Sequence, residues 1–553
     1  MLAKVKSGAV IGIDGYLVDV EVDLAQGLPA FDIVGLPDSA VRESRDRVRT
    51  AIRNRGYHFP VKRITVNLAP ADIRKSGPAF DLPIAVGILI GTNVLPPSAQ
   101  AGAFFTGELS LDGAVRPVSG VLSMVLAARE FAARELAARE SADREFVARE
   151  PATRESAVRE PAPGGHVGHA GHVACFVPAQ NAAEAALAQG VTVYPVNTID
   201  DVVGHFEGRL IAPLSVDINS MFENKTMYPV DFADVKGQPA IKRALEVAAS
   251  GYHNMLMVGP PGAGKTMLAT RMPTIMPSLD FEESLEITKI YSVAGLFDKT
   301  DKSEKNDGKN QLVTNRPFRA PHHTASLTSL VGGGQMAKPG EISLAHNGVL
   351  FLDELTEFQK KTLEVLRQPL EEGTVTVSRA GGTYTYPSAF LLLASMNPCP
   401  CGYYGTDKCR CAGYEVDRYL NKVSGPLLDR MDIQTEVGAV DYQQLSTAET
   451  ETSADIKKRV IAARSRQQTR FAGDTIKVNA HMTAPMIEKY CPLGKQEQVL
   501  LGQAFDTMNL SARAYHKILK IARTIADLDD SDSINVMHLT EAISYRGLDR
   551  KFW

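Results

Sequence analysis

Hydrophobic and polar residues alternate near the start of the chain in the way expected of half-buried strands. Residues 15–24 place an apolar side chain at every second position, and residues 64–68 repeat this pattern. Between them, apolar residues recur at a helical spacing within residues 39–55. The pattern predicts a small α+β domain, which we expect residues 173–203 to complete.

A pentapeptide repeat interrupts this predicted domain between residues 128 and 172. The pair Arg-Glu recurs at every fifth position from Arg129 to Arg159. Because five residues turn roughly 140° around a helix axis, the repeat builds no continuous apolar face. Each Glu precedes the next Arg by four residues, an order that stabilises a helix by roughly a few tenths of a kcal/mol per pair. We expect an exposed, partly helical insertion, and we interpret the three histidines near its end as part of its biased composition rather than as metal ligands, the alternative role.

Longer apolar runs indicate a second, larger unit. After a linker at residues 209–224, residues 225–445 alternate buried-strand patterns with helical ones, which is typical of an α/β domain with a parallel sheet. Residues 446–553 have the pattern of charged helices. We therefore expect an N-terminal domain over residues 1–208, an α/β core and a C-terminal helical region.

Composition and charge limit the partners that the chain can have. Its 553 residues are 44% hydrophobic and 22% charged, which is ordinary for a globular protein and excludes a wholly disordered one. The 60 Lys and Arg residues nearly balance the 64 Asp and Glu residues, which gives a net charge of −4. A contact with nucleic acid must therefore be local, for example inside a ring or a groove.

No apolar run in the sequence predicts a membrane span. The best one, residues 82–95, is shorter than the roughly 20 residues required and contains Pro83 and Asn93. Acidic residues from Asp14 onward interrupt any signal-peptide core. We expect a cytoplasmic protein that binds no membrane.

A glycine-rich loop after residues 255–258 fits the phosphate-binding motif G-x-x-x-x-G-K-[ST] at every position. Glycines let backbone N–H groups turn inward around phosphate oxygens, and the N-terminus of the following helix adds partial positive charge. We expect Lys265 to reach the β- and γ-phosphates of ATP and Thr266 to ligate Mg²⁺. The predicted nucleotide-binding residues of this loop are Gly259, Pro260, Pro261, Gly262, Ala263, Gly264, Lys265 and Thr266.

Two further buried-strand patterns end in polar side chains. Residues 348–352 lead into Asp353, which we expect to hold Mg²⁺, and Glu354, which we expect to polarise the attacking water. Residues 390–396 lead into Asn397, which is suited to orient that water. Together with the phosphate loop, these residues predict a site that hydrolyses ATP.

Arg430 lies in the segment Ser424-Gly-Pro-Leu-Leu-Asp-Arg-Met-Asp432 and has two alternative roles. A guanidinium supplied across a subunit boundary stabilises transition-state charge on the γ-phosphate, an effect worth ~10³–10⁵ in rate in GTPases. In the other role, Arg430 forms an ordinary salt bridge with Asp429 or Asp432. The spacing alone favours neither role.

Four of the six cysteines lie close together in the sequence. Cys399, Cys401, Cys409 and Cys411 supply four thiolates, the number that suits tetrahedral Zn²⁺. The spacing is Cys-x-Cys rather than the commoner Cys-x-x-Cys, so reduced free thiols are the alternative. We expect a structural zinc clip that braces the loop after Asn397.

The order of these motifs resembles that of the AAA+ ATPases and, more narrowly, of the magnesium-chelatase-like ComM/YifB family. The resemblance implies that Asn397 is the sensor-1 residue, Arg430 the arginine finger and Arg513 the sensor-2 residue, which contacts nucleotide from a helical lid. It further implies a homo-oligomeric, hexameric ring that uses ATP for branch migration of DNA in recombination and natural transformation. The segments that carry the resemblance are residues 231–238, 316–323, 338–354, 397–402, 424–432, 512–513 and 522–528.

The same resemblance gives a role to a predicted hairpin. Residues 374–386 place β-forming residues around Ala-Gly-Gly-Thr, with Arg379 beside the tip. In related ring ATPases a hairpin at this position points into the central pore, where Arg379 would grip DNA phosphates; a structural hairpin with a solvated Arg is the alternative. A second basic group, either substrate-facing or between subunits, consists of Arg316, Arg319, His322, His323 and Lys338.

The N-terminal domain is similar to Lon-type protease domains over residues 107–118 and 75–81. By that match Ala79 occupies the position of the nucleophile, and no Lys lies between Ser119 and Met124, where the general base is expected. We therefore predict a Lon-protease-like fold without protease activity, used for assembly or DNA contact.

Three functions compete. The first is a DNA-translocating ATPase, the second is a chelatase-type ATPase that remodels a protein partner for metal insertion, and the third is a nucleotide-gated scaffold. The set of Lys265, Asp353 and Glu354 argues against the scaffold. The Lon-like domain and the cysteine cluster separate ComM-like chains from chelatase subunits, so we favour the DNA motor.

Overall fold

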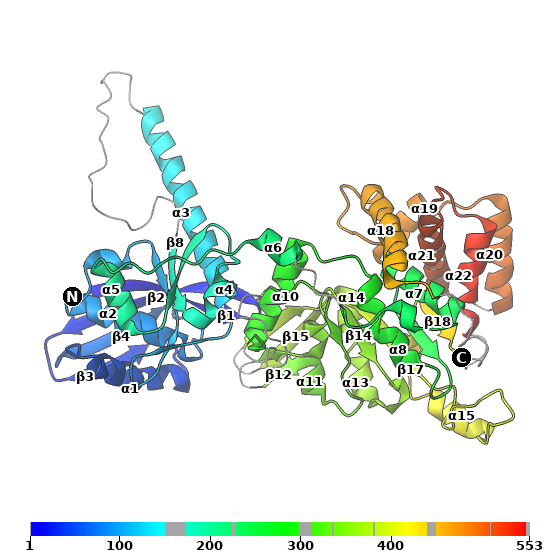
Figure 1. Cartoon of the computed structure of the whole chain (residues 1–553), viewed down its shortest axis with the longest axis horizontal. Helices are drawn as coiled ribbons and strands as arrows, with labels where there is room; N and C mark the ends of the chain where they lie inside the picture. Colours follow the sequence, from blue (N-terminus) through cyan, green and yellow to red (C-terminus); the bar gives the residue numbers. More distant parts are fainter. Residues whose placement is uncertain are drawn as a thin grey trace.

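The computed structural model of the chain is elongated, with three parts in a row (Figure 1). An N-terminal sheet with its helices lies at one end, a parallel sheet lies in the middle, and the C-terminal helices pack at the other end (Figure 1). The structure describes residues 2–149, 173–223, 228–297, 312–334, 337–379, 382–438, 450–508 and 510–548.

The N-terminal sheet is mixed and has the strand order β3-β4-β2-β1-β5-β8-β9. β2 runs antiparallel to β1 and β4, whereas the other neighbours are parallel. Because β8 and β9 extend the sheet beyond β5, the segment after the insertion completes it, as predicted. The strands are β1 (Leu2–Ile11), β2 (Asp14–Ala25), β3 (Ala30–Val34), β4 (Arg63–Ala69), β5 (Ala103–Phe105), β8 (Val173–Pro178) and β9 (Val191–Val196).

Helix α2 (Asp81–Gly91) forms the centre of this part's core. Its first ten residues are all buried, and it packs against β1 and β2, so the longest apolar run of the sequence is a core helix. Within the described part of the chain, the structure has no helix long and apolar enough to cross a bilayer. The other helices around the sheet are α1 (Ser39–Asn54), α3 (Val121–Arg149), α4 (Ala182–Ala185) and α5 (Ile199–Phe206).

Helix α3 carries the first part of the Arg-Glu repeat and projects away from the sheet (Figure 1). Arg134 Nη2 lies 3.9 Å from Glu130 Oε2, which is the expected pairing of a Glu with the Arg four residues later. The predicted helical stretch is thus confirmed up to Arg149, and its side chains over residues 131–138 are exposed or half-buried. The three histidines near the end of the insertion lie outside the described residues.

The middle of the molecule is a five-stranded parallel sheet in the order β11-β14-β17-β10-β18. β10, β14 and β17 are buried at every residue, which explains their continuous apolar sequences. Because all strands run the same way, the residues that follow them meet at one edge, the carboxyl edge, and those that precede them meet at the amino edge. The strands are β10 (Met255–Val258), β11 (Phe318–Arg319), β14 (Val349–Leu352), β17 (Leu391–Met396) and β18 (Ile433–Glu436).

Two hairpins extend from the core toward the N-terminal part. β12 (Gly332–Gly333) pairs with β13 (Lys338–Pro339), and β15 (Thr374–Arg379) pairs with β16 (Gly382–Pro387), which confirms the predicted hairpin. The second hairpin touches the turn between β1 and β2: a Cβ at Gly12 would lie 3.1 Å from the carbonyl oxygen of Thr385. The helices of the core used below are α7 (Pro239–Gly251), α8 (Lys265–Thr270), α14 (Arg367–Glu372), α15 (Gly413–Leu420) and α16 (Gly425–Leu428).

We refer to the C-terminal helices as the lid, and they share one apolar cluster with the core sheet. A buried polar network also holds the lid together: the Asp527 carboxylate accepts hydrogen bonds from Arg470 and, at 2.8 Å, from Asn479. The fold class predicted from the sequence is therefore confirmed: a mixed-sheet N-terminal part, a parallel core and a helical end. The lid helices are α18 (Ser453–Arg470), α19 (Ala484–Tyr490), α20 (Lys495–Met508), α21 (Ala512–Leu528) and α22 (Val536–Ser544).

Candidate functional site

The glycine-rich loop occupies the turn between β10 and α8 at the carboxyl edge. Gly262 and Gly264 have φ values of 79° and 81°, where a side chain is strained, and a Cβ at either would point into open space. At Gly259 a Cβ would lie 2.3 Å from the carbonyl oxygen of Val437, so glycine is required for the close approach to the end of β18. The loop is an open backbone cradle, which fits a phosphate chain.

Thr266 and Asp353 meet beside this loop. Thr266 Oγ1 donates a hydrogen bond to Asp353 Oδ2 at 2.6 Å, and the Ser395 hydroxyl donates to the other carboxylate oxygen. Hydroxyl and carboxylate oxygens are ligands that suit Mg²⁺ next to phosphate oxygens. Ser395 is absent from the predicted site, although strand pairing could have found it: Leu352 pairs with Ala394, so the next residues of the two strands are neighbours.

Lys265 and Asn397 also come together at the carboxyl edge. Lys265 Nζ donates to the carbonyl oxygen of Gly259 at 2.7 Å and to Asn397 Oδ1 at 3.1 Å. Burial lowers the pKa of Lys265, while the carboxylates of Asp353 and Glu354 act in the opposite direction. The carboxyl edge thus brings together four residues from three predicted motifs: Lys265, Thr266, Asp353 and Asn397.

Glu354 lies next to His323, a histidine that the sequence motifs did not place in the nucleotide site. Glu354 has a left-handed backbone, φ 53° and ψ 50°, so the chain turns as it leaves β14. Its Oε2 lies 3.4 Å from His323 Nδ1. His323 follows β11, which pairs in parallel with β14, so the topology brings both residues to the same edge.

Arg430 lies at the opposite, amino edge of the sheet. The backbone N–H of Asp432 donates to the carbonyl oxygen of Asn254 at 2.8 Å, just before β10 begins. Arg430 and the phosphate loop are therefore separated by the length of β10, roughly 13 Å for four residues. The guanidinium pairs with Glu371 of α14, a partner that neither alternative from the sequence included.

Arg513 lies with Arg430. It is in the first turn of α21, its side chain is 72% exposed, and its Nη1 is 3.8 Å from Asp429 Oδ2. The structure thus divides the predicted residues between the two edges of the sheet. Lys265 and Thr266 are at the carboxyl edge, and the two arginines are at the amino edge.

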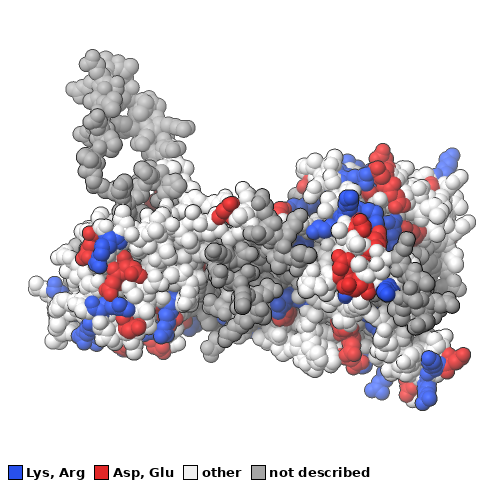
Figure 2. Space-filling view, viewed as in Figure 1, with Lys and Arg blue, Asp and Glu red and all other residues white. Residues whose placement is uncertain are grey.

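The second basic group does not form one patch. Arg316 pairs with Glu283 at 2.9 Å and Arg319 with Glu341 at 2.6 Å, and both are partly buried, so these arginines brace the core. On the face drawn in Figure 2, basic and acidic residues of the described surface lie mixed over the N-terminal part and over α18. A broad basic field is not seen on that face.

Arg379 lies beside the tip of the β15–β16 hairpin. Its guanidinium covers the backbone of the other hairpin, because a Cβ at Gly333 would lie 2.3 Å from Arg379 Nη2. Arg379 Nη1 donates to the carbonyl oxygen of Ser378 at 3.3 Å, and within the described ranges it has no carboxylate partner. Its charge is therefore open to an anion.

The four predicted cysteines form one cluster next to the phosphate loop. Their sulfur atoms lie within 4.8 Å of one another, and Cys401 Sγ is 3.3 Å from Cys399 Sγ and 3.8 Å from Cys409 Sγ. A tetrahedral Zn²⁺ separates its sulfur ligands by roughly 3.8 Å, whereas a disulfide joins them at about 2.05 Å. The set fits a four-thiolate metal site. Gly402 packs so tightly on Pro261 that a Cβ there would lie 2.5 Å from the proline ring.

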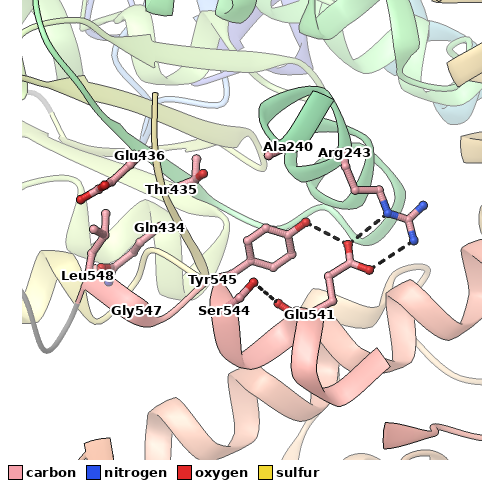
Figure 3. Close-up of a pocket in the computed structure, with 10 residues that line it drawn as sticks. All are labelled: Ala240, Arg243, Gln434, Thr435, Glu436, Glu541, Ser544, Tyr545, Gly547 and Leu548. Carbon is pink, nitrogen blue, oxygen red and sulfur yellow. Dashed lines mark hydrogen bonds and ion pairs between the residues drawn. The ribbon is translucent and has the colours of Figure 1, made fainter. Parts of the chain in front are cut away.

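The lid and the core meet in a pocket of about 650 Å³ beside β18 (Figure 3). Glu541 of α22 accepts hydrogen bonds from Arg243 Nε of α7 at 3.0 Å and from the Tyr545 hydroxyl at 2.9 Å. The contact with Arg243 fastens the lid to the core (Figure 3). The residues that line the pocket include none of the predicted site residues.

Comparisons with known proteins cover nearly the whole chain. Three family descriptions match: "Magnesium chelatase, subunit ChlI" over residues 231–445, "Subunit ChlI of Mg-chelatase" over residues 20–140, and "Magnesium chelatase, subunit ChlI C-terminal" over residues 450–546. A magnesium-chelatase subunit, ChlI-1, from Arabidopsis thaliana is 21% identical over 285 residues, which are 49% of this chain and 57% of that protein.

Other relatives match from end to end. The competence protein ComM of Haemophilus influenzae is 41% identical over 553 residues, which cover 99% of this chain and 98% of that protein. YifB of Escherichia coli is 39% identical with the same coverage. The chain therefore belongs to the ComM/YifB family of magnesium-chelatase-like AAA ATPases.

Proposed function

We propose that the chain is a ring-shaped DNA motor that hydrolyses ATP at the contacts between subunits and drives branch migration in recombination and natural transformation. The observation that supports this most is the division of the site: the phosphate loop and Arg430 lie at opposite edges of one sheet. One chain cannot bring them to the same nucleotide. A neighbouring copy can.

At the carboxyl edge, we assign the cleavage of ATP to residues of one chain. Lys265 binds the β- and γ-phosphates, and Thr266 and Asp353 hold Mg²⁺, which neutralises phosphate charge when bound. Glu354 accepts a proton from the attacking water, and Asn397 orients that water. The geometry supports the assignment of the Mg²⁺ ligands, because the hydroxyl of Thr266 and the carboxylate of Asp353 are in direct contact at 2.6 Å.

At the amino edge, we assign the partner role to Arg430, with Arg513 beside it. If the amino edge of one copy faces the carboxyl edge of the next, both arginines reach the neighbour's γ-phosphate. Such a contact joins two different surfaces, and it forms a closed ring when its rotation closes. We propose that the ring is a hexamer because the family resemblance implies one.

Arg379 is the proposed DNA contact. It lies beside a hairpin tip, has no carboxylate partner among the described residues, and has its guanidinium stretched over Gly333. A net charge of −4 and the mixed charges in Figure 2 agree with a local contact inside a ring rather than a broad basic face. The name of the Haemophilus influenzae relative, a competence protein, favours DNA as the substrate.

The substitution Arg379→Ala tests the DNA contact. We expect branched DNA to raise the rate of ATP hydrolysis, and the variant to need at least about tenfold more DNA for half-maximal stimulation with an unchanged rate without DNA. The salt dependence of DNA binding should weaken by about one unit of slope per lost contact. Arg418→Ala, an exposed change on α15, is the control and should behave as the original chain does. Equal DNA affinity of the two variants would contradict the assignment.

The alternative function is that of a chelatase-type ATPase that remodels a protein partner for metal insertion. The names of all three matched families favour this function. ATP hydrolysis that does not respond to forked or four-way DNA, together with no strand displacement, would favour this function over the DNA motor.

We also propose that the cysteine cluster holds one structural Zn²⁺ that braces the loop between Asn397 and α15. Purified protein should contain about one zinc per chain, and Cys401→Ser should lose it, because a neutral hydroxyl replaces one of four thiolates. Cys175→Ser is the control, since Cys175 is a buried cysteine outside the cluster. Unchanged zinc in the Cys401 variant by atomic emission would exclude the site.

The proposal also includes the domain boundaries, the fold of the N-terminal domain and the place where the protein acts. We propose domain boundaries at residues 1–208, 225–445 and 446–553, and a Lon-like N-terminal fold that lacks protease activity because Ala79 replaces the nucleophile. The proposed substrates are ATP and branched or single-stranded DNA, and we expect the protein to act in the cytoplasm.

A further inference from the structure

The loop that carries Arg430 is held by the lid of its own chain. We call residues 424–432 the finger loop. Lys517 of α21 donates through Nζ to the carbonyl oxygens of Asp429 and, at 3.2 Å, of Met431, and it lies 3.2 Å from Asp432 Oδ1. The two peptide carbonyls on either side of Arg430 are therefore bound by one ammonium group.

A second lid cation binds the same loop. Arg546, which follows α22 and is only 3% exposed, donates through Nη1 to the carbonyl oxygen of Met431 at 2.8 Å. The carbonyl oxygen of Met431 thus accepts hydrogen bonds from two lid side chains, Lys517 and Arg546. From the core, the side-chain amide of Asn254 donates to the carbonyl oxygen of Arg430 at 3.2 Å, and Glu371 pairs with the guanidinium.

Asp432 connects this clamp to the sheet and back to the lid. Its Oδ2 lies 3.5 Å from His253 Nδ1, and His253 Nε2 lies 2.8 Å from Thr524 Oγ1, again on α21. Although burial raises it, the pKa of Asp432 is held well below its usual range by the Lys517 ammonium and by the His253 imidazole beside it. The carboxylate is charged, and it fixes the lysine in a site that excludes most water.

We propose that Lys517 is a positioning residue that aims Arg430 at the nucleotide of the neighbouring subunit, so that the position of the lid in one subunit sets the activity of the next site. This inference rests on the proposed function in one respect, the action of Arg430 across the subunit boundary. The physical basis is that a catalytic group displaced by about 1 Å can cost roughly a hundredfold in rate. Lys517 fixes the backbone on both sides of that group.

The substitution Lys517→Ala should lower kcat for ATP hydrolysis by at least about tenfold while the KM for ATP stays within about twofold. The reason is that the variant's own phosphate loop is intact and only the arginine offered to its neighbour is displaced. Lys517→Arg, which keeps a donor at the same place, should restore part of the rate. Lys520→Ala is the matched control: Lys520 is on the same helix and donates to Ala480 at 2.8 Å, outside the finger loop.

Mixed rings separate this role from a structural one. Glu354→Gln subunits cannot hydrolyse ATP but carry an intact arginine, so mixing them with Arg430→Ala subunits before ATP is added should restore hydrolysis. Lys517→Ala subunits mixed with Glu354→Gln subunits should regain activity in the same way. Subunits that carry both Glu354→Gln and Lys517→Ala should fail to restore the activity of Arg430→Ala subunits.

The outcomes distinguish the inference from the function beneath it. If Arg430→Ala is restored by Glu354→Gln but Lys517→Ala is not, Lys517 acts in its own site or in folding, and the inference is wrong. The inference is also wrong if subunits with both Glu354→Gln and Lys517→Ala restore ATP hydrolysis when they are mixed with Arg430→Ala subunits. If the mixture of Arg430→Ala and Glu354→Gln subunits stays inactive, the proposed active site shared between subunits is wrong. The inference, which rests on that site, is then wrong as well. Should Lys517→Ala not fold, judged by thermal unfolding, Lys517→Met keeps the apolar stem and takes its place in every mixture.

Discussion

Replacing Glu354 by Gln is expected to abolish ATP hydrolysis while ATP binding is retained. The amide cannot accept the proton of the attacking water, and general-base catalysis contributes roughly 10²–10⁴ in rate. The cradle of the phosphate loop and the contact of Thr266 with Asp353 at 2.6 Å do not involve this side chain, so affinity for ATP should persist. Phosphate release and the binding of a fluorescent ATP analogue measure the two properties separately.

Glu357→Gln is the matched control for this change. Glu357 lies three residues further on, is exposed, and pairs only with Lys422 at 3.5 Å among the described residues, so its loss should leave hydrolysis within about twofold. A Glu354→Gln protein that releases phosphate at the rate of the original chain would show that another group activates the water.

Arg430→Ala is expected to lower kcat by roughly 10³–10⁵, the range found where an arginine stabilises charge on a transferred phosphoryl group. The KM for ATP should change far less, because Lys265 and Thr266 bind the nucleotide from the other edge of the sheet. The measurement is steady-state phosphate release over a range of ATP concentrations, at a protein concentration where rings form.

Glu371→Gln decides between the two roles of Arg430. Glu371 is the in-chain partner of the guanidinium, so a salt bridge that merely stabilises the fold would be broken equally by either substitution. If Arg430 acts on the neighbour's ATP, Glu371→Gln should keep most of the activity. Equal losses in the two variants would identify Arg430 as a structural residue.

The grouping of residues at the carboxyl edge was predictable because these residues belong to continuous sequence motifs. A phosphate loop needs its glycines in one run, and Asp353 and Asn397 each follow an apolar strand directly, so strand ends in a parallel sheet had to bring them together. The buried strands β10, β14 and β17 followed from the same apolar runs.

The contacts that connect distant segments were not predictable in this way. The approach of His323 to Glu354 depends on β11 lying next to β14, and strand order is not visible in an apolar pattern. The pairing of Arg430 with Glu371, and the grip of Lys517 on the carbonyl oxygens around Arg430, join residues 59 and 88 positions apart. Such pairs depend on how the elements pack. The sequence does not show which partner a charged residue of a helix will contact.

The most direct test of the account is strand displacement from a four-way DNA junction by the purified protein with ATP and Mg²⁺. We predict that the original chain converts the junction to its branch-migration products, and that Glu354→Gln, which binds ATP without cleaving it, leaves the junction intact. Vigorous ATP hydrolysis by the original chain with no movement of the junction would contradict the account, because the energy released at the subunit contacts would then not be used on DNA.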